Sequence, residues 1–76
     1  MTTTKSLTTT VPVGSGIIWL TGYRAHNTTA RFVIRHDNHG GTVLAHNGVE
    51  WQTAHRYLAP IVGVANVAAI LRSVLP

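Results

Sequence analysis

Residues 30–53 read ARFVIRHDNHGGTVLAHNGVEWQT, and this stretch decides the fold class. Its β-branched and aromatic residues are typical of strands, whereas its Asn- and Gly-rich segments are typical of tight turns. The strongest turn signal is Asn47-Gly48, because a type I′ hairpin turn needs two residues that tolerate positive φ. The predicted strands cover residues 30–36, 42–46 and 49–53, and the other predicted turn covers residues 37–41.

The sheet extends towards the N-terminus. Residues 16–23 (GIIWLTGY) predict a further strand, and residues 24–29 predict a polar connection to the next one. Alternation in that next strand places Phe32 and Ile34 on one face and the two arginines, Arg31 and Arg35, on the other with Val33. Consecutive short strands joined by tight turns favour an antiparallel meander over about residues 16–53.

Residues 1–15 (MTTTKSLTTTVPVGS) predict an extended, threonine-rich arm, because threonine is stiff at its branched β-carbon. Two interpretations stay open: a frayed terminus, or an arm that becomes ordered by adding a strand to a neighbour's sheet edge. Gly14-Ser15-Gly16 would act as a pivot. The predicted domains are therefore an arm over residues 1–15 and a single small domain over residues 16–76.

The C-terminal segment predicts helices. Thr53 is the expected N-cap of a short helix over residues 54–58, and Pro60 is expected to end it and to begin a second helix. We prefer a helix for residues 64–74, although a short β-branched run cannot exclude a strand. The predicted fold class is α+β, a small antiparallel meander with an N-terminal arm and an apolar helical C-terminal segment, and the alternative is all-β.

Charge is scarce and unevenly distributed. Only 11% of the 76 residues are charged, and from Tyr57 to Pro76 the one charged residue is Arg72. A domain of this size has a large surface for its volume, so we expect neighbouring chains to cover part of its apolar sequence. The predicted interface residues are Leu7, Val11, Val13, Ile61, Val64, Val67, Ile70, Leu71 and Val74.

The formal net charge of +4 reflects two acidic residues more than an abundance of bases, and the six basic residues never cluster. Nucleic-acid-binding proteins usually carry a run or stripe of Lys and Arg. The aromatic residues could stack bases, but at this spacing they more often form a core. A small basic nucleic-acid-binding module is therefore the alternative function. These aromatic residues are Trp19, Tyr23, Phe32, Trp51 and Tyr57.

Catalytic and metal chemistry have little support in the sequence. Without cysteine, the chain has no disulfide and no thiolate metal site. The five histidines follow no zinc spacing, and no serine lies in a strand-turn-helix elbow. We expect no enzyme activity, no metal and no cofactor. The histidines are His26, His36, His39, His46 and His55.

No segment resembles a signal peptide, and the C-terminal apolar stretch is interrupted and at the short end of a membrane span, so integral insertion is not expected. The localisation stays open between virion and cytoplasm. The expected function is a non-enzymatic structural or assembly protein, as a homo-oligomer or part of a larger assembly. A small capsid-stabilising or decoration subunit is one example of this class.

Overall fold

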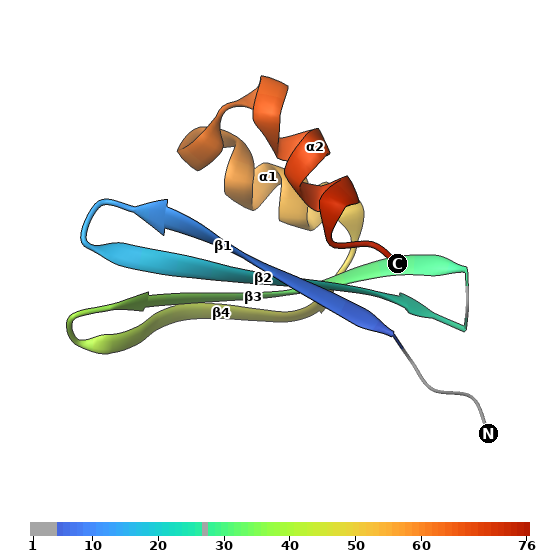
Figure 1. Ribbon diagram of the computed structural model, residues 1–76, viewed down its shortest axis with the longest axis horizontal. Coiled ribbons are helices and arrows are strands. Elements are labelled where there is room, and N and C mark those ends of the chain that lie inside the picture. The colour runs from blue at the N-terminus through green and yellow to red at the C-terminus, as the bar shows by residue number, and fades with distance from the viewer. Residues whose placement is uncertain (1–4, 27) are drawn as a thin grey trace.

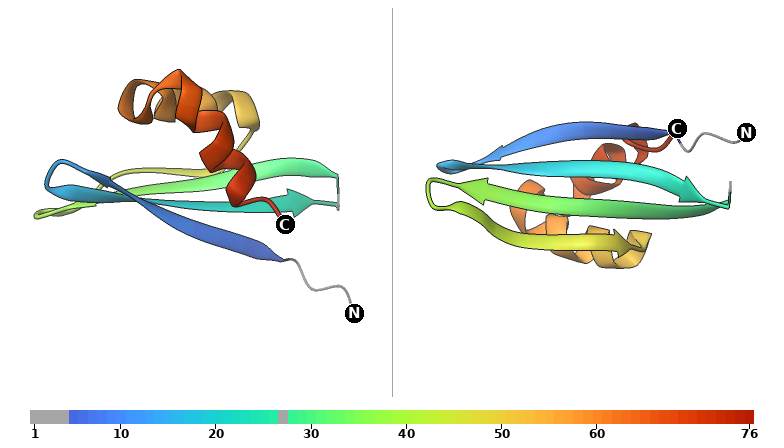
Figure 2. Two further views of the ribbon diagram at one scale, coloured as in Figure 1. Left: turned by 45° about the horizontal axis from the view of Figure 1, so that its top comes forward. Right: turned by 90° about the horizontal axis from the view of Figure 1, so that it is seen from below.

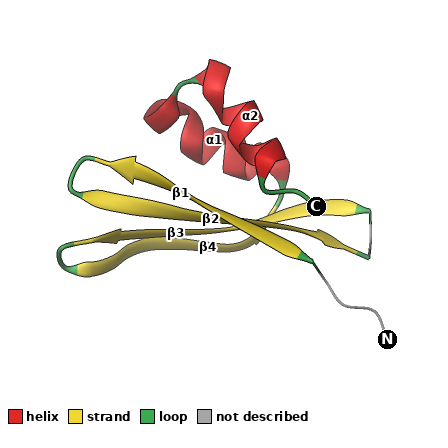
Figure 3. Cartoon of the chain, in the orientation of Figure 1, coloured by secondary structure: helices red, strands yellow, loops and turns green. Residues whose placement is uncertain are grey.

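The computed structural model describes residues 5–26 and 28–76, which form a four-stranded antiparallel sheet and two helices (Figure 1). The strands lie side by side in sequence order, so the sheet is the predicted meander. The all-β alternative is wrong, because the C-terminal segment is helical (Figure 3). The elements are β1 (Ser6–Val13), β2 (Gly16–Ala25), β3 (Thr29–Asn38), β4 (Gly41–Val49), α1 (Trp51–Val62) and α2 (Val64–Ser73).

The molecule has two layers. Both helices lie over one face of the sheet, and the other face carries no helix (Figure 2). The central strands supply the buried side chains of the covered face, among them Phe32 and Ile34, as the alternation predicts. The core between the layers consists of Ile18, Leu20, Phe32, Ile34, Ala54, Leu58, Val67, Leu71 and Val74.

Most of the residues predicted to form the arm belong to β1. Residues 6–13 are extended, as expected, but they pair with β2 of the same chain from Ser6↔Tyr23 to Val13↔Gly16. Gly14 takes φ 55 at the first central position of the two-residue turn, which a type II′ hairpin requires. A separate arm over residues 1–15 is therefore wrong for this part of the chain, and residues 1–4 lie outside the described residues.

The predicted hairpin at Asn47-Gly48 is also wrong. β4 continues through both residues, and its register with β3 shifts by one residue, from Ile34↔His46 to Phe32↔Val49. Gly48 does adopt positive φ, at 67°, but this serves a β-bulge in one strand instead of a reversal between two. The predicted strand over residues 49–53 is consequently absent from the described fold. The predicted turn near residues 37–41 is confirmed, with Asn38 opposite Gly41.

The helices begin and end at other residues than predicted. Trp51 begins α1, and its ring packs edge-on against Phe32 with centroids 6.0 Å apart. The N-cap residue is Glu50 and not Thr53, and Pro60 lies inside α1. The chain bends instead at Gly63, whose φ of 90° is in the region that favours glycine.

Candidate interaction surfaces

The predicted interface residues fall into three groups, which are buried, exposed and partly buried. Val67, Leu71 and Val74 are fully buried or nearly so against the sheet. These three side chains belong to the core of the single chain, so the expectation that they face a partner is wrong in this fold. Leu7, Ile61 and Val64 are exposed, whereas Val11, Val13 and Ile70 are partly buried and pack against the core.

β1 forms one edge of the sheet, and its outer side has no strand partner in the described fold. In a two-residue hairpin, the pair next to the turn is hydrogen-bonded, and bonded and non-bonded pairs then alternate along the strands. Val13↔Gly16 is that first pair, so Pro12 falls at an outward position, where a residue without N–H fits. The backbone N–H groups of Ser6, Thr8 and Thr10 therefore point away from the sheet.

The opposite edge has a different construction. β4 contains two register shifts against β3, one near Gly48 and one between His36↔Leu44 and Asp37↔Thr42. Bulges twist an edge strand and disrupt the regular row of hydrogen-bonding groups that another strand needs. β1, in contrast, keeps an unbroken register with β2 and contains no charged residue. The sequence pattern of threonines indicated an extended segment but not which edge it would form.

The uncovered face of the sheet holds aromatic and arginine side chains that contact one another. The Arg35 guanidinium lies over the Trp19 ring at 5.0 Å, and its Nε donates to Asp37 at 3.1 Å. Arg31 donates to the Gly48 carbonyl at 2.9 Å and lies 3.9 Å from Glu50. Both acidic residues of the chain are thus paired with arginines of this face. A shallow depression of about 340 Å³ here is lined by Thr8, Trp19, Thr21, Val33 and Arg35.

The other aromatic residues lie on the covered side. Phe32 is in the core, and Tyr57 packs edge-on against His46 with centroids 5.1 Å apart. Burial raises the pKa of the Tyr57 hydroxyl above its usual value. Of the aromatic residues considered for base stacking, this leaves Trp19 and Tyr23 on the uncovered face.

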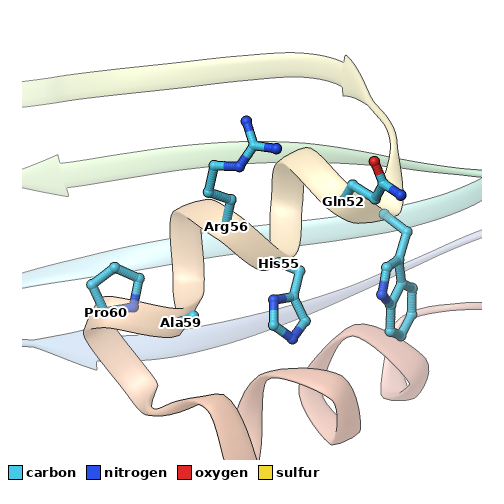
Figure 4. A pocket seen from close by; sticks show the side chains of 6 residues that line it. Gln52, His55, Arg56, Ala59 and Pro60 are labelled. Atoms are coloured by element: carbon cyan, nitrogen blue, oxygen red, sulfur yellow. The ribbon is translucent and has the colours of Figure 1, made fainter.

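A larger open depression of about 660 Å³ runs along α1 (Figure 4). Arg56 and His55 are among its lining residues, and no acidic side chain lines it. The lining places the positive charge of Arg56 beside apolar side chains. The lining residues are Trp51, Gln52, His55, Arg56, Ala59 and Pro60.

Among residues 5–26 and 28–76, no three His, Cys, Asp or Glu side chains lie together as a metal site would require. In the same part of the chain, neither helix has the length and hydropathy needed to cross a bilayer. Comparison of the chain with protein families, with curated proteins and with solved structures found no match.

Proposed function

We propose that this protein is a non-enzymatic assembly component that associates with copies of itself through the outer edge of β1. The observation that supports this most is the contrast between the two sheet edges. β4 carries two bulges, whereas β1 is regular, uncharged and eight residues long. An exposed edge of that kind is a template for pairing with another strand.

Antiparallel pairing of β1 with β1 of a second copy uses the outward groups of Ser6, Thr8 and Thr10 on both chains. The two-fold axis is then perpendicular to the sheet, so the contact is isologous and the two sheets become continuous. Both helix layers lie on the same side of the joined sheet. Leu7, which is 45% exposed and lies on β1, adds apolar contact at this edge.

One strand pair buries less than the ~1,200 Å² of a standard complex, so we expect association that depends on protein concentration. Small subunits that stabilise or decorate virus particles are one class in which such contacts are repeated many times. Repetition on one particle strengthens each weak contact, because subunits that are held side by side have a high effective concentration.

The test removes one outward N–H without altering the inner side of the strand. Thr10→Pro eliminates the N–H at an outward position, and Thr10→Ala is the matched control that retains it. We expect light scattering over a concentration series to show association of the wild type and of Thr10→Ala, and a loss of at least about tenfold in association constant for Thr10→Pro. A wild type that stays monomeric at high concentration, or equal association of both variants, would contradict the proposal.

The alternative function is nucleic-acid binding on the uncovered face, where Trp19 and Tyr23 lie near Arg31 and Arg35. Its weakness is that both arginines already have acidic partners, since Arg35 lies 3.1 Å from Asp37 and Arg31 lies 3.9 Å from Glu50. A phosphate-binding surface loses affinity steeply as salt increases, whereas strand pairing does not. Fluorescence titration of single-stranded DNA at two salt concentrations therefore separates the two functions.

A further inference from the structure

The bend between the two helices lies at the centre of a long uncharged stretch and forms an exposed tip. Residues 57–71 contain no charged residue, and Arg56 and Arg72 flank this stretch on either side. Gly63 reverses the chain at its centre, and we call residues 60–65 the elbow. The elbow is held in shape by Asn66, whose side-chain amide donates to the Val62 carbonyl at 2.9 Å and whose backbone N–H donates to Gly63 at 3.0 Å.

Apolar side chains of the elbow are exposed to solvent. Val64 is 69% exposed, the highest value among the large apolar residues that are exposed in the described part of the chain, and Ile61 is 37% exposed. These two residues lie on either side of Gly63, one on each helix. The elbow therefore exposes apolar side chains at the bend, next to the depression along α1 that Pro60 also lines.

The two flanking arginines are both exposed, and each lies on a solvent-facing row of its helix that leads to one end of the elbow. In α1, Arg56 and Pro60 are one turn apart and both are exposed. In α2, Ala65, Ala69 and Arg72 continue an exposed row in the same way. At the rise of an α-helix, Arg56 and Arg72 lie about 10 Å and about 14 Å along their helices from Gly63.

Neither of the two helices contains an acidic residue. No acidic residue follows Glu50 in the sequence, and Glu50 itself lies 3.9 Å from Arg31 of the sheet. The Arg72 guanidinium lies over the Trp51 ring at 6.0 Å, which orients it but adds no negative charge. An apolar tip with positive charge on both sides complements a surface with an apolar interior beneath a negatively charged layer.

We propose that the elbow docks this protein onto the surface of an anionic lipid bilayer. Ile61 and Val64 insert at the boundary between headgroups and acyl chains, a depth of about 5–10 Å. At their distance from Gly63, Arg56 and Arg72 then lie among the phosphate groups. Only the elbow enters the interface, because Leu58, Val67 and Leu71 of the uncharged stretch are buried against the sheet.

An acidic protein is the other partner with suitable charge, but the geometry favours lipid. A protein partner is usually anchored by side chains that fill a desolvated pocket. Here the apolar residues protrude at a bend, and the arginines lie behind them on two separate helices. A bilayer offers the two chemistries at different depths, so its apolar interior can receive the tip while its phosphate layer reaches the arginines behind it.

The experiment measures binding of the full chain to large vesicles by co-sedimentation, with phosphatidylserine–phosphatidylcholine vesicles compared with pure phosphatidylcholine. We expect measurable binding to the anionic vesicles and a loss of about fivefold in partition coefficient for Arg56→Gln, since each basic residue near such a surface contributes about this factor. Raising the salt concentration should weaken the binding.

Val64→Asp tests the apolar contribution, and Val43→Asp is its matched control, because Val43 is 56% exposed on β4, far from the elbow in sequence and on the other layer. We expect Val64→Asp to lower the partition coefficient at least about tenfold, Val64→Trp to raise it, and Val43→Asp to leave it within about twofold. Equal binding to both vesicle types, or equal loss with both aspartate variants, overturns the proposal.

Capture of polyglutamate without binding to either vesicle type also overturns the proposal, because it assigns the surface to an acidic protein. The outcome is independent of self-association through β1. Val64→Asp should leave the mass in solution unchanged, and Thr10→Pro should retain vesicle binding of the single chain.

Discussion

Gly22 in β2 lies directly against Val74, the residue that follows α2. A Cβ at position 22 would lie 2.6 Å from the Val74 carbonyl oxygen and 2.7 Å from its Cγ2. Real Cβ atoms do not approach other atoms so closely, so even alanine at this position requires the end of α2 to move. The absence of a side chain at Gly22 thus allows the C-terminal helix to close onto the sheet.

Gly22→Ala should therefore destabilise the fold by about 1–3 kcal/mol, the usual cost of inserting a methyl group into a packed core. Gly40→Ala is the matched control, because a Cβ there would be 3.5 Å from the Asn38 Oδ1 and would meet no backbone atom. Urea denaturation measures both. Equal stability of the two variants would show that α2 adjusts freely.

Val67→Ala and Val64→Ala compare the same substitution at two positions of α2. Val67 is fully buried and Val64 is mostly exposed. We expect a loss of about 1–3 kcal/mol in unfolding free energy for Val67→Ala and less than about 0.5 kcal/mol for Val64→Ala. The free energies come from chemical denaturation followed by circular dichroism. Similar losses at both positions would contradict the orientation of the helix.

Gly48→Val should destabilise the bulge in β4, because φ at this position is 67° and valine is branched at the β-carbon. We expect a loss of about 1–3 kcal/mol, and a smaller loss for Gly48→Asn, since asparagine tolerates the left-handed region. Amide spectra should show changes confined to β3 and β4 for Gly48→Asn. Unchanged melting temperature in the valine variant would mean that the bulge is not needed.

The stability of the protein should decrease at alkaline pH partly because of Tyr57. Burial raises the pKa of its hydroxyl above the unfolded value of 10.0, so the folded state retains a proton that the unfolded state loses. The stabilising contribution is complete below about pH 10 and is lost as the pH rises through the folded pKa. Melting temperatures at pH 9 and pH 11 should differ less in Tyr57→Phe than in the wild type.

Local sequence patterns determined much of the sheet and the helical class of the C-terminal segment. Alternation in residues 30–36 determined that Phe32 and Ile34 face the core, because successive side chains of a strand point to opposite faces. The turn near residues 37–41 was readable because its residues tolerate conformations that others do not. Both signals act over a few residues and need no distant partner.

Tertiary pairing decided what the same local signals meant elsewhere. Positive φ at Gly48 fits a hairpin and a bulge equally well, and only the pairing with β3 selects the bulge. The threonine-rich segment was extended in either case, but its partner, β2, is specified by long-range hydrogen bonds. Val67 and Leu71 are apolar whether a partner or the chain's own sheet covers them, and only the close approach of α2 at Gly22 determines that the sheet does so.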